Sequence, residues 1–139
     1  MKVVDVMHKG INALEPQTPI AAVAMTMQEK DVGALPITEN GALIGIVTDR
    51  DIAIRGLAQG DDTSKLTARD VMTTGVAFCT ERDTVKDAAH VMESRKVRRL
   101  PVLDGGKKVI GMLSLGDISH AASRELTSDV MKAVSAHHA

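Results

Sequence analysis

The 139-residue sequence has almost no aromatic side chains: it contains one Phe and neither Trp nor Tyr. Proteins that bind single-stranded nucleic acid usually stack bases on aromatic rings, so this class is disfavoured. Because hydrophobic residues still make up 44% of the chain, its core must be aliphatic. A chain of this length predicts one compact domain, or two half-domains that share a core.

The sequence also has almost no net charge, a single cysteine and no long apolar run. The 17 basic and 18 acidic residues nearly cancel, so no broad field attracts nucleic acid or anionic lipid. Cys79 is the only cysteine, which excludes an intramolecular disulfide and favours a reducing compartment. No apolar run approaches the roughly 20 residues of a membrane span, and residues 1–10 lack the apolar stretch of a signal peptide. We therefore expect a cytoplasmic protein with no membrane contact.

What the sequence does contain is an internal duplication. A shift of 65 residues aligns Asp-Val-Met at 5–7 with the same triplet at 70–72. After one extra residue in the second copy, a shift of 66 aligns Ile-Gly at 44–45 with Ile-Gly at 110–111. Ordered identities with a single gap indicate a duplication and not the short-period array of a solenoid.

Each copy is predicted to form a short strand, a helix, a two-stranded hairpin and a second helix, which is an α+β fold with β-α-β-β-α repeats. Hydrophobic spacing and the turn signals between the strands support this order. In the first copy the elements are predicted at residues 12–14, 18–30, 34–38, 43–47 and 49–58. In the second copy they are predicted at residues 77–79, from 83 onward, 99–103, 109–113 and 116–125. Thr18 and Asp83 are the expected caps of the two long helices.

Neither copy is expected to be stable alone, because a small sheet with one covered face leaves its other apolar face in water. We predict that the two copies pack sheet against sheet about a pseudo-two-fold axis. The expected boundaries are 1–60 for the first copy, 61–67 for a linker, 68–125 for the second copy and 126–139 for a short helix with a loose tail.

A hydroxyl and an aspartate follow the hairpin of each copy: Thr48 and Asp51 in the first, Ser114 and Asp117 in the second. A strand that ends at a hydroxyl and runs into a helix brings unpaired N–H groups beside that hydroxyl, which favours an anion. A carboxylate that accepts two hydrogen bonds suits a ribose diol. The alternative is that these residues only cap and stabilise their helices. Recurrence of the pattern in both copies favours a binding site.

These motifs together resemble tandem cystathionine β-synthase (CBS) domains, the pair often called a Bateman module. The resemblance rests on the repeated Asp-Val-Met segment, the Leu-Pro strand, the glycine hairpin and the hydroxyl-x-x-Asp-Ile exit, and it covers residues 3–123. It implies a regulatory fold that binds AMP, ADP, ATP, NAD(H) or S-adenosylmethionine in clefts between the two repeats. In that family the motif aspartate holds the ribose, and the motif Thr or Ser contacts phosphate or ribose.

The resemblance implies two nucleotide-binding clefts, one with Asp51 and Thr48 and the other with Asp117 and Ser114. The candidate walls of the first cleft are Thr18, Ile20, Val32, Ala34 and Pro36. The candidate walls of the second are Val85, Val97 and Pro101.

The two copies differ in the basic residues that could reach a phosphate. Arg98 and Arg99 stand where the first copy has Gly33 and Ala34, and Arg is well shaped to bind phosphate. The alternative is that they form a solvated strand start. Arg50 would serve the first cleft, and Gly116 takes its place in the second copy. We therefore expect two unequal sites.

The remaining reactive residue types suggest no chemistry. Cys79 is expected to be a small core residue. The five histidines lack the spacing of a zinc motif, so we expect no metal. The sequence has no nucleophile elbow, P-loop, GxGxxG or HExxH motif, so we expect no enzyme.

Two hypotheses follow. The first is a stand-alone CBS pair that binds an adenine nucleotide as a regulatory ligand, forms a homodimer through Ala and Met on its helices, and signals to a target enzyme or transporter in trans. The second is a ligand-free interaction scaffold that docks onto an enzyme or transporter. Nucleic-acid binding through residues 95–99 is disfavoured by the neutral charge and the missing aromatics.

Overall fold

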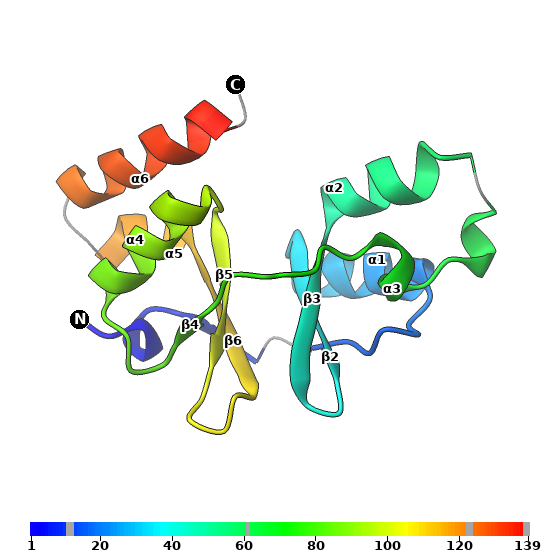
Figure 1. Cartoon of the computed structure of the whole chain (residues 1–139), viewed down its shortest axis with the longest axis horizontal. Helices are drawn as coiled ribbons and strands as arrows, with labels where there is room; N and C mark the ends of the chain where they lie inside the picture. The colour runs from blue at the N-terminus through cyan, green and yellow to red at the C-terminus, as the bar shows by residue number, and fades with distance from the viewer. Residues whose placement is uncertain (11–12, 61, 122–123, 138–139) are drawn as a thin grey trace. The chain divides into compact units, whose positions relative to one another are not determined.

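A computed structural model describes residues 1–10, 13–60, 62–121 and 124–137. The chain forms two compact units: unit 1 consists of Met1–Gly10 and Ala77–Ala139, and unit 2 of Ile11–Val76. Each unit combines helices with strands (Figure 1), which confirms the predicted α+β class. None of the helices in the described part is long and apolar enough to cross a membrane.

Unit 1 is built on a four-stranded sheet with the strand order β1-β6-β5-β4. β5 and β6 form an antiparallel hairpin, β4 runs parallel to β5, and β1 runs antiparallel to β6. The strands are β1 (His8–Lys9), β4 (Cys79–Thr80), β5 (Arg99–Leu103) and β6 (Val109–Ser114). The helices are η1 (Val3–Asp5), α4 (Val85–Arg95), α5 (Leu115–Ala121) and α6 (Arg124–His137).

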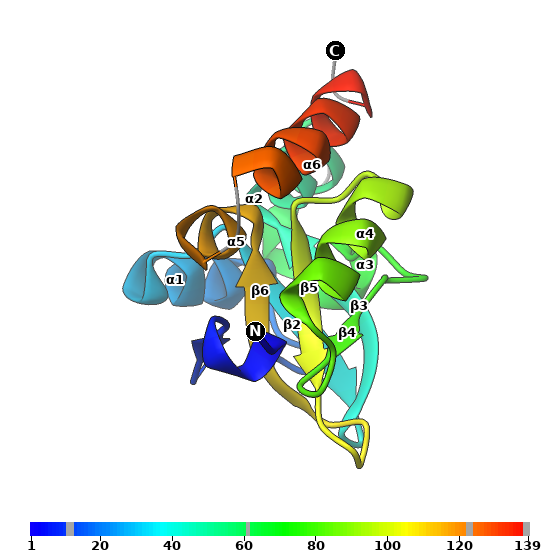
Figure 2. The same ribbon diagram turned by 90° about the vertical axis from the view of Figure 1, so that its left-hand side faces the viewer.

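The C-terminal helix α6 is an integral part of unit 1. It packs against α4 and α5, and all three helices lie on the same side of the sheet (Figures 1 and 2). Val130 and Val134 lie four residues apart on one helical face, and both are buried in the unit's aliphatic core. The prediction of a short helix from residue 126 with a loose tail was therefore wrong about this helix, which has 14 residues. Residues 138 and 139 lie outside the described part.

Unit 2 is built on the hairpin of β2 (Ala34–Glu39) and β3 (Ala42–Thr48), which turns at Asn40 and Gly41 as the sequence predicts. The long helix α1 (Ile20–Lys30) packs its buried Ile20, Val23 and Met27 into the core of this unit. After the hairpin come α2 (Asp49–Asp51) and the π-helix η2 (Ile52–Leu57). Two short helices, η3 (Thr63–Lys65) and α3 (Ala68–Val71), lie in and directly after the region expected to be a linker.

The starts of both long helices differ from the prediction. Thr84, not Asp83, caps α4: its hydroxyl accepts a hydrogen bond from the N–H of Asp87, 3.0 Å away. Asp83 instead accepts a hydrogen bond from the Thr80 N–H in the preceding turn. At α1 the N-cap position is Pro19, not Thr18, and no side chain caps this helix.

The Asp-Val-Met segments of the two copies are exchanged between the units. We call residues 5–9 the first DVM segment and residues 70–74 the second. The first DVM segment pairs His8 with Met112 in unit 1, and the second pairs Thr73 with Ile46 in unit 2. Each sequence copy therefore contributes its DVM segment to the unit that holds the other copy's hairpin. The expected copy boundaries do not describe this exchange and stay a prediction, as does packing of sheet against sheet.

The strand pairing is the same in the two units, because equivalent residues of the two copies are paired. His8 and Thr73 are equivalent under the shift of 65, and their partners Met112 and Ile46 are equivalent under the shift of 66. On the other side of each hairpin, Cys79 pairs in parallel with Val102 and Leu14 with Ile37, again at equivalent positions. The predicted short first strands thus exist as β4 and as a single bridge at Leu14, while residues 11 and 12 lie outside the described part.

Two glycines permit this exchange. A Cβ atom at Gly111 would lie 2.5 Å from the carbonyl oxygen of His8 and 3.0 Å from the Sδ of Met7. At the equivalent Gly45 it would lie 2.7 Å from the Sδ of Met72 and 3.0 Å from the carbonyl oxygen of Thr73. Only glycine lets the backbones approach so closely, which explains why the Ile-Gly pair occurs in both copies.

Gly111→Ala is expected to lower the free energy of unfolding by about 1–3 kcal/mol, because the added methyl group must displace the backbone of His8. Urea denaturation measures this change, and hydrogen exchange at residues 8–9 should accelerate. Gly105→Ala is the matched control, since a Cβ there meets nothing within 4 Å; its effect should stay within about 0.5 kcal/mol. Equal unfolding free energies for the two variants would contradict this packing.

Candidate functional site

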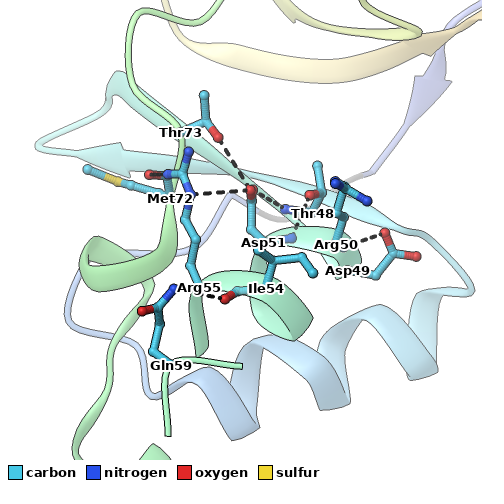
Figure 3. Close-up of polar contacts among 9 residues, drawn as sticks. All are labelled: Thr48, Asp49, Arg50, Asp51, Ile54, Arg55, Gln59, Met72 and Thr73. Atoms are coloured by element: carbon cyan, nitrogen blue, oxygen red, sulfur yellow. Dashed lines mark hydrogen bonds and ion pairs between the residues drawn. The ribbon is translucent and has the colours of Figure 1, made fainter. Parts of the chain in front are cut away.

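In unit 2, Thr48 and Asp51 form a reciprocal pair of hydrogen bonds where β3 runs into α2 (Figure 3). The Thr48 hydroxyl accepts a hydrogen bond from the Asp51 N–H at 3.1 Å, and the Thr48 N–H donates to Asp51 Oδ2 at 2.9 Å. This arrangement is a capping box, which fixes the side chains of both residues. We call it the Asp51 corner.

In unit 1, Ser114 and Asp117 repeat this geometry where β6 runs into α5. The Asp117 N–H donates to the Ser114 hydroxyl at 3.1 Å, and the Ser114 N–H donates to Asp117 Oδ2 at 2.8 Å. Both aspartates are mostly buried, with side-chain exposures of 13% for Asp51 and 14% for Asp117. We call this arrangement the Asp117 corner.

These residues do cap their helices, but the capping hydrogen bonds do not use all of their polar atoms. Each hydroxyl uses an oxygen lone pair as an acceptor and keeps its own hydrogen to donate. Each aspartate uses Oδ2 for the cap and keeps Oδ1. A corner of this kind can therefore still donate one hydrogen bond and accept others, as a bound hydroxyl or phosphate group requires.

The Oδ1 atom of Asp51 faces two residues that the sequence analysis did not select. The Thr73 hydroxyl lies 3.5 Å from it, and Arg55 Nε lies 4.0 Å from it (Figure 3). Arg55 also donates from Nη1 to the carbonyl oxygen of Met72 at 2.9 Å. Its guanidinium therefore joins the Asp51 corner to the second DVM segment. The spacing of Asp51 and Arg55 by four residues on a helix was the signal in the sequence.

The Oδ1 atom of Asp117 faces His8, whose Nδ1 lies 3.4 Å away. His8 and Thr73 are equivalent residues of the two DVM segments, so the same position supplies the neighbour of Oδ1 in both units. The sequence signal was their shared place directly after Asp-Val-Met. It was missed because nothing in the sequence indicates that these segments exchange.

The predicted wall residues divide between the two units. Those of the first cleft lie in unit 2 with Asp51, and those of the second lie in unit 1 with Asp117. Ile20 and Val85 are each only 4% exposed, because they belong to the aliphatic cores. Their side chains mainly support the fold, and direct contact with a ligand stays a prediction. The other wall residues are buried or half-buried: Thr18, Val32, Ala34, Pro36, Val97 and Pro101.

The predicted phosphate-binding arginines are exposed. Arg50 lies in α2, and its N–H donates to Asp49 Oδ1 at 2.9 Å, so this first-turn N–H is already used. Arg98 precedes β5 and Arg99 begins it. The carbonyl oxygen of Arg98 accepts a hydrogen bond from the N–H of Leu115 at 2.8 Å, which places its backbone next to the Asp117 corner. A role in phosphate binding stays a prediction for all three.

The CBS domain family matches residues 3–56 and residues 68–124. The two matches cover most of the chain, and each includes one corner. The chain therefore belongs to the CBS domain family and carries two CBS domains, as the repeated motifs predict.

Solved relatives share this fold. The crystal structure of Hypoxic Response Protein I, a protein known from Mycobacterium tuberculosis, has a TM-score of 0.79 at 31% identity and covers 88% of this chain and 100% of its own. The CBS domain pair of protein MJ0100, in complex with 5-methylthioadenosine and S-adenosyl-L-methionine, has a TM-score of 0.77 at 30% identity, over 86% and 94% of the two chains. CBSX2 from Arabidopsis thaliana, in complex with AMP, has a TM-score of 0.74 at 28% identity over the same shares.

One of these relatives corrects the expectation that no metal is involved. Hypoxic Response Protein I was solved with two coordinated zinc ions, so histidine spacing was a poor guide for this family. Within the described residues of this chain, no group of three or more His, Cys, Asp or Glu side chains could hold a metal ion. His8 and Asp117 supply two donors at one place. Because structural zinc takes four ligands, an ion there would need further donors beyond this pair.

Cys79 lies in β4 and is only 1% exposed. Burial, together with the nearby negative charge of Asp83, raises the pKa of its thiol to about 12. The thiolate is the reactive form of cysteine, so this side chain is inert at neutral pH. The expectation of a small core residue is confirmed by this burial.

Alkylation of Cys79 by iodoacetamide at pH 8 is expected to be about a thousandfold slower in the native chain than in urea, because its thiol pKa lies about three units above the ordinary value. Intact mass spectrometry measures the rate without ambiguity, since the sequence has one cysteine. Labelling in the native state at the rate seen in urea would contradict the assigned burial and pKa.

Proposed function

We propose that this chain is a regulatory protein that binds an adenosyl ligand, such as AMP, ADP, ATP, NAD(H) or S-adenosylmethionine. The ligand would lie in clefts between the two CBS repeats, residues 1–60 and 68–125. Asp51 and Asp117 would hold the ribose hydroxyls, and Thr48 and Ser114 would contact ribose or phosphate. Occupancy would be relayed to an enzyme or transporter in trans, in the cytoplasm, without a catalytic step in this chain.

The observation that carries this proposal is the repetition of one polar corner. A capping box alone needs no particular residue to face its spare carboxylate oxygen, yet in both units that oxygen faces the equivalent residue, His8 or Thr73. The aspartates are mostly buried, and the described contacts of their Oδ1 atoms are 3.4–4.0 Å long. A mostly buried carboxylate of this kind is suited to accept hydrogen bonds from a diol.

The solved relatives support the choice of ligand class. S-adenosyl-L-methionine, 5-methylthioadenosine and AMP share adenosine and differ at the 5′ position of the ribose. A site that recognises adenine and ribose would accept all three, whereas discrimination among them needs groups near the 5′ position. In this chain Arg98 and Arg99 stand beside the Asp117 corner and Arg50 stands beside the Asp51 corner. The Asp51 corner also has Arg55, but this side chain already contacts Asp51 and the carbonyl oxygen of Met72. An anionic ligand would therefore favour the Asp117 corner.

The first test is a thermal shift and calorimetric titration with AMP, ADP, ATP, NADH and S-adenosylmethionine. At least one should stabilise the chain, by mass action on the folded state. Asp117→Asn keeps an acceptor for the cap but removes the charge, so it should weaken binding at its corner about tenfold or more. Asp51→Asn should do the same at the other corner.

Asp129→Ala is the control for this series, because Asp129 is an exposed residue of α6 that belongs to neither corner. It should leave affinity unchanged. Binding that is indifferent to both Asp→Asn variants would sink the proposed site. If no ligand stabilises the chain, the ligand-free interaction scaffold becomes the better explanation, and a stable partner in a pull-down would support it.

The proposed homodimer would form through apolar side chains left exposed on the helices. Met25 in α1 and Ile54 and Leu57 in η2 are 59%, 47% and 63% exposed, and all three lie in unit 2. Unit 1 also has exposed apolar side chains, at Met1, Phe78 and Met131, but those of unit 2 lie on the helices named in this proposal, and exposed apolar side chains can mark a protein contact. Sedimentation velocity should give a dimer for the unmodified chain and a monomer for Leu57→Lys. Phe78→Lys, at an exposed apolar residue of unit 1, is the control and should leave the dimer intact.

A further inference from the structure

We propose that His8 and Thr73 are positioning residues of the two corners: each orients the aspartate of its unit toward a ribose hydroxyl and sets the affinity of that site for the ribose. This inference rests on the proposed binding of an adenosyl ligand. It adds one residue from each DVM segment to a site that the hydroxyl-x-x-Asp motif alone does not describe.

The first step concerns which oxygen each aspartate can offer. Oδ2 is held by the backbone N–H of Thr48 or Ser114 at 2.9 and 2.8 Å, respectively. Among the described residues, Oδ1 has longer contacts: 3.5 Å to the Thr73 hydroxyl and 4.0 Å to Arg55 Nε at Asp51, and 3.4 Å to His8 Nδ1 at Asp117. Contacts of this length limit rotation of the carboxylate without saturating Oδ1. A ligand hydroxyl can therefore donate to Oδ1 in a direction that its neighbour has already set.

The second step concerns why the same position appears twice. The close approach at Gly45 and Gly111 fixes the DVM segments against β3 and β6, and the register places Thr73 and His8 at equivalent points. The residue after Asp-Val-Met is thereby held near the aspartate by backbone pairing. Its side chain is free to differ, which makes the position suitable for setting specificity.

The third step concerns the difference between the two residues. Thr73 is half-buried and directs a hydroxyl at Asp51 Oδ1, and Arg55 contacts the same oxygen. His8 offers an imidazole that is 71% exposed, and the residue equivalent to Arg55 is Ala121, which has no polar side chain. The Asp117 corner therefore depends on His8 alone for orientation of Oδ1 among the described contacts, whereas the Asp51 corner has two such neighbours.

The test is an NMR titration of the 15N-labelled chain with adenosine, the part shared by all candidate ligands, and with 2′,3′-dideoxyadenosine. The amides of Ser114 and Thr48 donate to the two aspartates, so each reports one corner. His8→Gln should weaken adenosine about three- to tenfold at the Ser114 reporter. His8→Asn should retain the affinity, since its amide nitrogen can take the place of Nδ1.

The Thr48 reporter is the internal control and should not change in either His8 variant. Thr73→Val should weaken the binding of adenosine at the Thr48 reporter, by a smaller factor than His8→Gln weakens it at the Ser114 reporter. Thr73→Ser, which keeps the hydroxyl, should bind adenosine as the unmodified chain does. Affinity for 2′,3′-dideoxyadenosine should be the same in all variants, because it lacks the 2′ and 3′ hydroxyls that would donate a hydrogen bond to Oδ1. A general loss of folding would instead weaken both compounds at both reporters.

The outcomes separate this inference from the proposed function. If adenosine does not bind the unmodified chain, the proposed ribose site is wrong, and this inference falls with it. If adenosine binds and Asp117→Asn weakens it, while His8→Gln and His8→Asn both match the unmodified chain, the proposed function stands and the positioning role is wrong. Equal losses for adenosine and its dideoxy analogue in His8→Gln would also overturn the positioning role.

Discussion

The close approach of each DVM segment to a glycine in the facing hairpin is the constraint on which the rest of the structure depends. With no side chain at Gly45 and Gly111, the backbones of Thr73 and His8 can pair with β3 and β6. That pairing covers an otherwise open strand edge in both hairpins, which would be prone to wrong pairing. It also brings residues from the start of each sequence copy to the corner at the end of the other copy's hairpin.

The corners follow from this constraint together with helix capping. A reciprocal pair of hydrogen bonds fixes the Asp51 and Asp117 side chains, and capping boxes of this kind contribute about 0.5–2 kcal/mol. This local stabilisation holds Oδ2, while the neighbour of Oδ1 comes from a distant part of the chain. Capping and binding are therefore compatible uses of one carboxylate, because they employ different oxygen atoms.

Much of this architecture could be predicted from the sequence, because its causes are local. Alternating apolar residues and the Asn40-Gly41 turn predict the hairpin, and helical spacing predicts α1 and α4. The exchange could not be predicted, because a strand of two residues such as β1 has no period to detect. The two long helices end at Asp31 and Lys96, which have left-handed backbone conformations. Glycine is the usual sequence signal for a helix end of this kind, and these positions lack it. Arg55 was missed although it lies four residues after Asp51, because this spacing alone does not indicate that its guanidinium also reaches the carbonyl oxygen of Met72.

The exchange also bears on why the chain contains two copies. A single copy would have a hairpin without its outer strand and an aspartate without the neighbour of Oδ1, and it would need a second molecule to supply both. Joining two copies in one chain makes that exchange intramolecular, where the effective concentration is about millimolar for a short flexible connection. Each corner then forms at any protein concentration. The two DVM segments also become separate residues of one sequence, so His8 and Thr73 can differ, which identical molecules could not achieve.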